Sequence, residues 1–256
     1  MSAANSEITG EVMARIVPAG IYGEEARKIL VQNHPELQGM SLNEVRLIEP
    51  VQPLVKGESR FFQAENDARF QAVEQWANEP SVDHLLGGGH GLAAVVETPI
   101  FIREEKSTGV PDFENTSSYI LVSRKCLDIL ESFDSGHIES KAIHRRNRNG
   151  VSLGEYLIID VLRRVPAIDW GNSHIRAEGV RWPLPPHDLR VSLRVANGYR
   201  IRQDIAEGVH IFRDERDVSR VFVSLELKAA MEAAGVTGVV YSDPAGLLAL
   251  NPPVQA

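Results

Sequence analysis

The stretch Val221–Gly238 reads VFVSLELKAAMEAAGVTG, and it contains the clearest succession of elements in the chain. Its first three residues are β-branched or aromatic, which favours a strand. Ser224 follows, and its hydroxyl can accept the free N–H groups of a first helical turn, where Glu226 also suits the helix dipole. Apolar residues then recur at spacings of three and four, and Gly235 can end the helix in a left-handed conformation. The stretch therefore predicts a strand, a serine-capped helix and, from Val236, a second strand.

A similar succession begins at Tyr119, where the sequence YILVSRKCLDILE also passes from a strand pattern through a serine to an amphipathic helix. Ser123 takes the place of Ser224 in this stretch, and Cys126 falls on the apolar face of its helix. Two such units can reflect a duplicated half, or they can be two uses of one simple local solution, since the sequence between them shows no matching.

The composition is that of a soluble globular protein with a real hydrophobic core. The chain has 256 residues, of which 43% are hydrophobic and 24% are charged, and its formal net charge is −8. A nucleic-acid-binding surface needs a concentrated basic face, so the charge argues against that class and is compatible with a basic protein partner. With Cys126 as the single cysteine of the sequence, an intramolecular disulfide is excluded and a buried structural thiol is predicted.

The sequence carries no recognisable targeting pattern. Its first residues lack the basic segment and apolar run of a secretion signal. No apolar stretch approaches the roughly 20 residues that a membrane-spanning helix needs. We therefore expect a cytoplasmic, soluble protein that does not act on membranes.

Local patterns divide the chain into two predicted regions. Residues 1–95 are predicted to be mainly helical, and they include a helix over Phe61–Asn78 with an apolar stripe. Residues 96–256 are predicted to form an α+β domain with a mixed, largely antiparallel sheet and flanking helices, including the two strand–serine–helix units.

Two polar segments are predicted to be turns. The pair Asn149-Gly150 indicates a tight hairpin between strands at Ile138–Ile143 and Tyr156–Val161. The charged run Arg213–Asp217, RDERD, is predicted to be an exposed turn between two strands, or alternatively to make charged contacts at an interface.

The glycine cluster Gly87–Gly91 has two interpretations, a flexible loop or a phosphate cradle. A cradle needs a strand before it, a helix directly after it, and usually a lysine with a serine or threonine. Leu92–Val96 has the pattern of a strand instead. We therefore expect a mobile surface loop, with a nucleotide-using protein as the competing interpretation.

The segment Gly150–Gly154, GVSLG, matches the Gly-x-Ser-x-Gly pattern of esterases, with Ser152 in the position of the nucleophile. Asp160, Asp169 and His174 follow in the chain order of a catalytic triad. The pattern has meaning only where the serine lies on a sharp turn from strand to helix, whereas a hairpin explains the same residues here. A small hydrolase that uses Ser152 is therefore the alternative function.

The remaining polar residues form no pattern of a metal or catalytic site. No pair of histidines has the i, i+4 spacing beside a carboxylate that a helical zinc site would offer. Adjacent acidic residues adjoin turns or helix starts and indicate solvated charge. The sequence thus predicts no metal, no cofactor and no catalytic residue, which favours a binding role.

Three blocks of sequence occur in order over about residues 110–242. They are PDF at Pro111–Phe113 with Tyr119–Leu130, EYLIIDVLRRVPAID at Glu155–Asp169, and HIFR at His210–Arg213 with Val221–Gly238. In these blocks the chain resembles an immunity-protein family of bacterial polymorphic toxin systems, the one typified by a Myxococcus protein. The resemblance implies a protein without enzymatic activity, which binds the toxin encoded by an adjacent gene and thereby protects the producing cell.

Durable occupancy of a toxin usually requires a buried aromatic or arginine anchor inside a polar rim. Trp170 and Trp182, in a proline-rich irregular segment, are candidate toxin-binding residues, or else both fill the core. The competing classes are an enzyme and a structural partner of a secretion apparatus.

Overall fold

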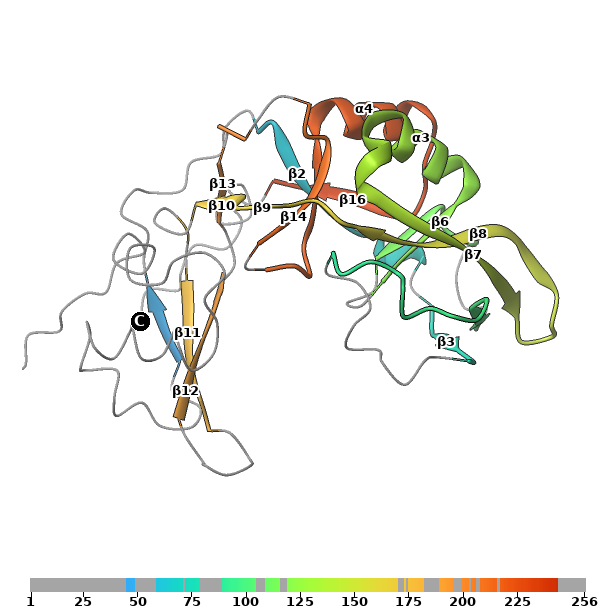
Figure 1. Cartoon of the computed structure of the whole chain (residues 1–256), viewed down its shortest axis with the longest axis horizontal. Helices are drawn as coiled ribbons and strands as arrows, with labels where there is room; N and C mark the ends of the chain where they lie inside the picture. The colour runs from blue at the N-terminus through green and yellow to red at the C-terminus, as the bar shows by residue number, and fades with distance from the viewer. Residues whose placement is uncertain are drawn as a thin grey trace, which may run out of the picture. The chain divides into compact units, whose positions relative to one another are not determined.

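The computed structural model of the chain describes residues 45–48, 59–70, 72–78, 89–104, 109–115, 119–169, 173, 175–181, 189–195, 199–202, 204–205, 208–215 and 217–243. The chain divides into two compact units. One comprises the described residues of 1–58, 166–202 and 243–256, and the other those of 59–165 and 203–242. The second unit contains both described α-helices (Figure 1). It also contains the pocket considered below.

The first unit contains two small antiparallel sheets. One sheet has the order β1-β11-β12, with β1 at Val45–Ile48, β11 at Ile175–Arg181 and β12 at Leu189–Val195. The other pairs β10, Ile168–Asp169, with β13, Arg200–Ile201. Ser173 ties this pair together, because its hydroxyl donates to the Asp169 carbonyl at 2.6 Å and accepts from the Arg200 N–H at 3.0 Å.

The second unit is built on a five-stranded and a six-stranded sheet. The five-stranded sheet has the order β16-β2-β15-β14-β9, formed by Val239–Ser242, Phe61–Asn66, Val221–Ser224, Ile211–Asp214 and Arg164–Val165. The six-stranded sheet has the order β3-β4-β7-β8-β6-β5, formed by Glu74–Trp76, Ile100–Arg103, Ile138–Asn147, Ser152–Val161, Ile120–Ser123 and Phe113–Asn115. The β9–β14 and β4–β7 pairs are parallel, and the other described pairs are antiparallel.

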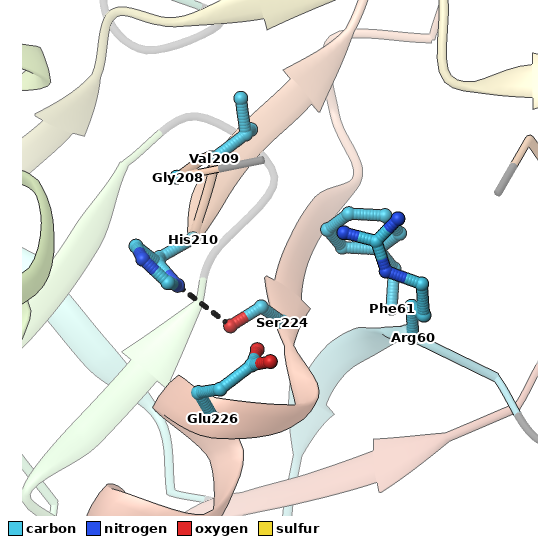
Figure 2. Close-up of a pocket in the computed structure, with 7 residues that line it drawn as sticks. All are labelled: Arg60, Phe61, Gly208, Val209, His210, Ser224 and Glu226. Atoms are coloured by element: carbon cyan, nitrogen blue, oxygen red, sulfur yellow. Dashed lines mark hydrogen bonds between the residues drawn. The ribbon is translucent and has the colours of Figure 1, made fainter. Parts of the chain in front are cut away.

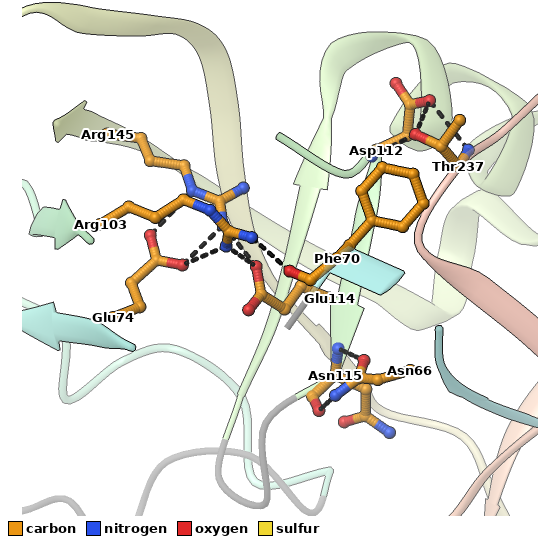
Figure 3. A network of polar contacts seen from close by, with 9 residues as sticks. All are labelled: Asn66, Phe70, Glu74, Arg103, Asp112, Glu114, Asn115, Arg145 and Thr237. Carbon is orange, nitrogen blue, oxygen red and sulfur yellow. Dashed lines mark hydrogen bonds and ion pairs between the residues drawn. The ribbon is translucent and has the colours of Figure 1, made fainter. Parts of the chain in front are cut away.

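Polar contacts join the two large sheets at β5. Asn66 of β2 and Asn115 of β5 exchange two hydrogen bonds, from the Asn115 N–H at 2.6 Å and from the Asn66 amide at 2.5 Å (Figure 3). Nearby, the Asp112 carboxylate accepts from the N–H and the hydroxyl of Thr237, both at 3.0 Å. Residues far apart in the sequence therefore hold the sheets in one unit.

Two helices, α3 (Arg124–Asp134) and α4 (Leu225–Ala233), lie side by side in this unit (Figure 1). Each follows a strand that ends in a serine. The Ser123 hydroxyl accepts from the Cys126 N–H, and the Ser224 hydroxyl accepts from the Leu227 N–H, both at 3.2 Å. The bonded N–H groups belong to first turns that have no intrahelical acceptor, so the serines stabilise both helix starts. Two short 3₁₀ helices, η2 (Ala68–Phe70) and η4 (Ser135–His137), complete the described helical segments.

The six-stranded sheet has an apolar core on each face. Successive strand residues point to opposite faces, so Ile120 of β6 packs in the core beneath the helices, whereas Leu121 packs in the opposite core. Ile159 and Ile158 of β8 alternate in the same way. Cys126 is buried in the helix-covered core, as the sequence predicted.

The α+β class and the Asn-Gly hairpin are confirmed, since β7 and β8 pair antiparallel around Asn149-Gly150. The predicted helix over Phe61–Asn78 is wrong. The segment forms β2 between β15 and β16, then η2, and then β3 at the edge of its sheet. Pairing with strands more than 150 residues away outweighs the local helical pattern, as tertiary context does for short apolar runs. The division into residues 1–95 and 96–256 stays a prediction, because residues 1–44 lie outside the described residues.

The strand predicted over Leu92–Val96 is also wrong. The segment is a turn closed by a 3.0 Å hydrogen bond from the Val95 N–H to the Leu92 carbonyl, and both side chains are buried. Within the described part of the chain, neither helix is long and apolar enough to cross a membrane.

Candidate functional site

A pocket of about 380 Å³ opens where β2, β14 and β15 meet the first turn of α4 (Figure 2). Two backbone hydrogen bonds of 2.8 Å bring its walls together, from the Ser224 N–H to the His210 carbonyl and from the Leu225 N–H to the Arg60 carbonyl. The residues that line it are Arg60, Phe61, Gly208, Val209, His210, Ser224 and Glu226.

A serine and a histidine form the centre of the pocket. His210 Nδ1 lies 3.0 Å from Ser224 Oγ, and the imidazole stands edge-on to the Phe133 ring with centroids 5.0 Å apart. On the other side of the pocket, the Arg60 guanidinium lies over the Phe61 ring, 5.4 Å from its centroid (Figure 2). Ring contacts of this kind hold side chains in defined orientations.

Glu226 supplies the negative charge of the pocket. Its own backbone N–H holds the pKa of the carboxyl below its usual value, and the Ser224 hydroxyl, His210 and Arg60 act in the same direction. Figure 2 shows the carboxylate turned toward Ser224. The group is therefore an anion at neutral pH, and it occupies the positive end of the α4 dipole.

The Ser224–His210 pair differs from the serine–histidine pair of a hydrolase. Ser224 is only 3% exposed, and its oxygen already accepts the Leu227 N–H as the helix cap. Among the described residues no carboxylate bonds to the His210 ring, whereas in a catalytic triad the acid orients the histidine through its second ring nitrogen. The arrangement suits a polar binding pocket.

A second polar cluster lies on the six-stranded sheet, on the face away from the helices (Figure 3). Arg145 donates to both oxygens of Glu74, at 2.8 and 2.6 Å, and also to Glu114. Arg103 donates to Glu114 at 2.8 Å, to Glu74 at 3.3 Å, and to the Phe70 carbonyl. Two guanidinium groups and two carboxylates thus balance each other in a nearly dry environment.

Burial and charge act on these groups in opposite directions. Burial raises the pKa of the Glu114 carboxyl, although Arg145 opposes this effect. Burial alone would lower the pKa of the Arg145 guanidinium, but Glu74 and Glu114 outweigh it and raise that pKa. The Arg145 guanidinium also lies 4.6 Å from the centroid of the Tyr156 ring. The cluster therefore positions strands β3, β4, β5 and β7 through paired charges.

The described end of the glycine cluster binds a carboxylate of the protein itself. The N–H groups of Gly89 and Gly91 donate to the two Asp160 oxygens, at 3.1 and 2.9 Å. Gly91 is buried, so the expectation of a surface loop is wrong for this part of the cluster. Both glycines have positive φ angles, 76° and 83°, which favour glycine.

The expectation of an exposed turn at Arg213–Asp217 is wrong at its start. Arg213 and Asp214 belong to β14 and are 2% and 0% exposed. Arg213 donates to Asp160 at 3.1 Å and to the Val218 carbonyl at 2.7 Å, and these partners permit its burial. A run of charged residues in the sequence does not reveal whether such partners are present in the fold.

The local structure at Ser152 does not fit the hydrolase hypothesis. Ser152 is an exposed residue of strand β8, where no helix begins, and its hydroxyl accepts from the Gly154 N–H at 3.4 Å. Asp160 already accepts hydrogen bonds from Arg213 and from the N–H groups of Gly89 and Gly91. Asp169 lies in β10. His174 lies outside the described residues.

The predicted anchors Trp170 and Trp182 also lie outside the described residues, so their role stays a prediction. Among the side chains that are described, no group of three or more metal-binding residues is present. Sequence reasoning identified Ser224 and Glu226 as parts of a helix start but missed the pocket. Two other residues of the pocket wall, Arg60 and His210, come close to Ser224 and Glu226 only because strands that are distant in the sequence pair with each other.

A protein-family model described as "Immunity protein family (Imm11)" matches residues 31–245. A search of curated proteins finds no match. The family match covers most of the chain and includes every residue that lines the pocket.

Proposed function

The chain belongs to the Imm11 immunity protein family, and from this we propose that it binds and neutralises a cognate bacterial toxin and so protects the cell that produces both. The observation that carries the proposal is the family match over residues 31–245. The partner is a toxin protein, with its gene beside that of the immunity protein. The site of action is the cytoplasm, and the inhibition occurs by binding, without catalysis or a cofactor.

The charge of the chain supports a protein partner of basic character. A net charge of −8 steers a basic toxin, such as a nuclease, toward the complex and disfavours direct binding of nucleic acid. Association should then slow as the salt concentration rises, since screening weakens long-range attraction. An association rate that is independent of salt would contradict this part of the proposal.

Trp170 and Trp182 are proposed as anchors of the toxin interface. Large aromatic side chains dominate the binding energy where they enter a desolvated pocket of the partner. Replacing either residue with alanine should weaken toxin binding and leave the melting temperature unchanged. A large loss of thermal stability would instead place that tryptophan in the core.

The experiment that tests the function begins with the native host. The tagged chain is purified by affinity, and the bound proteins are identified by mass spectrometry. A stoichiometric partner encoded by an adjacent gene is expected, and its toxic domain should stop the growth of a test strain unless this chain is co-expressed. A toxin that kills equally with and without the chain would refute the proposal.

A further inference from the structure

We propose that the toxin adds an extended strand to the outer edge of β3, the strand that ends the six-stranded sheet. This inference rests on the function proposed above and adds a contact site and the conformation of the toxin segment that occupies it. Addition of a strand to an exposed sheet edge is a recurring mode of recognition, in which backbone hydrogen bonds supply the affinity.

The hydrogen bonds between β3 and β4 show which backbone groups of β3 are already used. The Ala77 N–H donates to the Ile100 carbonyl at 2.8 Å, and the Val73 carbonyl accepts from the Glu104 N–H at 2.9 Å. In an antiparallel pair, residues that bond the partner strand alternate with residues whose N–H and C=O groups point the other way. The backbone groups of Val73, Gln75 and Ala77 therefore face β4.

The N–H and C=O groups of Glu74 and Trp76 consequently point to the outer side of β3. Among the described residues, these four groups form no hydrogen bond. The two side chains are engaged elsewhere, since the Glu74 carboxylate turns toward Arg103 and Arg145 (Figure 3) and Trp76 Nε1 donates to Asn78 Oδ1 at 3.1 Å. Such a row of unpaired peptide groups matches an extended backbone, which presents donors and acceptors at the same spacing.

The other edge strands of this unit are closed or short. At the opposite edge of the same sheet, the Phe113 N–H of β5 donates to the Thr237 carbonyl at 3.0 Å, and the Asn115 N–H donates to Asn66 at 2.6 Å. Because Thr237 leads into β16, the first of these bonds also covers one end of β16, an edge of the five-stranded sheet. The edge strand β9 has two residues. Among the described edges of this unit, β3 is thus the longest that no other strand contacts on its outer side.

The exposed face of β3 lacks the devices that keep an edge strand unpaired. Side chains alternate along a strand, so Val73, Gln75 and Ala77 share one face, and all three are exposed. None is charged, the segment contains no proline, and its register with β4 is continuous. Edges that must stay unpaired usually carry charges, prolines or bulges. The toxin strand should present uncharged side chains beside Val73, because a charge there would lose water without gaining a partner.

The charge of the chain favours a toxin strand over a second copy at this edge. Two copies that each carry a net charge of −8 repel one another. A toxin of basic character, as proposed above, is attracted instead.

Amide hydrogen exchange, measured residue by residue by NMR, tests the edge directly. In the free chain the Glu74 and Trp76 amides should exchange fast, whereas those of Gln75 and Ala77, which bond β4, should be protected. An inactive variant of the toxin domain encoded beside this chain is then added at a free concentration of about 100 times its Kd. Exchange at Glu74 and Trp76 should slow about a hundredfold, because only the unbound fraction still exchanges.

Two matched variants test the same contact by affinity. Val73→Lys places a charge beside the added strand and should raise the Kd for the inactive toxin about tenfold, because a lysine on an edge opposes pairing. Val240→Lys is the control, at a 40% exposed position of the edge strand β16, and should change the Kd less than about twofold. Both variants add the same charge, so their effects on long-range attraction are matched. Circular dichroism melting confirms that each variant is folded.

The outcomes separate this inference from the proposed function. Slowed exchange at Glu74 and Trp76 upon toxin binding, with the larger rise in Kd for Val73→Lys, supports the inference. Slowed exchange instead at Val239 and Tyr241, whose backbone groups point outward from β16, would place the toxin strand there.

Protection of Glu74 and Trp76 in the free chain that grows with its concentration would mean that a second copy occupies the edge. That result, slowed exchange at β16 alone, toxin binding without slowed exchange at β3, or equal Kd changes for the two variants would overturn the inference while the immunity function stands. A wild-type chain that fails to bind any such toxin would overturn the proposed function itself.

Discussion

Arg145 and Glu74 form two hydrogen bonds, at 2.8 and 2.6 Å, although strand β4 separates the strands that carry them. The side chains meet over β4, where Arg103 and Glu114 complete the buried cluster (Figure 3). A buried charge that loses its partner costs more than the pair contributes, because the remaining group stays desolvated. The cluster is therefore sensitive to the removal of a single member.

Replacing Arg145 with methionine should lower the free energy of unfolding by about 3–5 kcal/mol, because Glu74 and Glu114 would stay buried with less compensation. Arg148→Met, on the same hairpin, is the matched control. The Arg148 side chain is 68% exposed and pairs with Glu104 at the surface, so its loss should cost less than about 1 kcal/mol. Urea denaturation measures both, and equal costs would show that the cluster adds no stability.

The two capping serines should contribute similarly to stability. Ser123→Ala and Ser224→Ala each remove the acceptor of a first-turn N–H, and each should cost about 1 kcal/mol. Ser132→Ala is the control, since this exposed serine donates only to the Ile129 carbonyl within α3 and should change stability by less than about 0.5 kcal/mol. Urea denaturation measures these losses. If Ser123→Ala and Ser224→Ala lower the free energy of unfolding no more than Ser132→Ala does, the assignment of the two serines as helix caps is contradicted.

Gly91 should tolerate alanine less well than Gly150. Both have positive φ angles, 83° and 79°, so both substitutions carry the left-handed cost of about 1–2 kcal/mol. An added Cβ at Gly91 would also lie 2.5 Å from Glu139 Oε2, which accepts the Leu92 N–H, whereas no atom lies within 4 Å at Gly150. Gly91→Ala should therefore cost at least about 1 kcal/mol more in the free energy of unfolding. Equal costs would mean that Glu139 moves aside freely.

Cys126 should make stability depend on pH in the alkaline range. Burial, aided by the charge of Asp112, raises the pKa of the thiol from 9.0 to about 12. Below pH 9 the contribution of the neutral thiol to the free energy of unfolding is fully present. It is lost between pH 9 and 12, because the unfolded chain releases the thiol proton at a lower pH than the folded chain. Unfolding free energies should therefore fall more steeply with pH over that range for the wild type than for Cys126→Val. Identical slopes would contradict a buried thiol.

Much of the local structure could be read from the sequence. The Ser224 cap, the apolar face of α4 and the Asn149-Gly150 turn depend on residues within a few positions of each other. Such interactions recur wherever the same short pattern occurs. The family resemblance likewise rested on short blocks in order, and the family match confirms it.

The sequence-based predictions are wrong where the local structure depends on residues that are distant in the sequence. Arg213 is buried because Asp160, 53 residues earlier, lies opposite it, and Asp160 also holds the glycine loop. Phe61–Asn66 is a strand because β15 and β16 flank it. The local sequence pattern around Arg213 or Phe61–Asn66 does not reveal these distant partners. The same charges and the same periodicity would fit an exposed segment as well as a buried one.

The sequence by itself determined the α+β class, the helix starts and the buried cysteine, because capping and amphipathic spacing act within one or two turns of chain. Only the tertiary structure decided the pocket and the ion cluster. Their members come from segments that meet through strand pairing, as Arg60 meets Leu225 and Glu74 meets Arg145. The free energy of such contacts depends on burial and on the geometry of the partners, and neither can be derived from the local sequence.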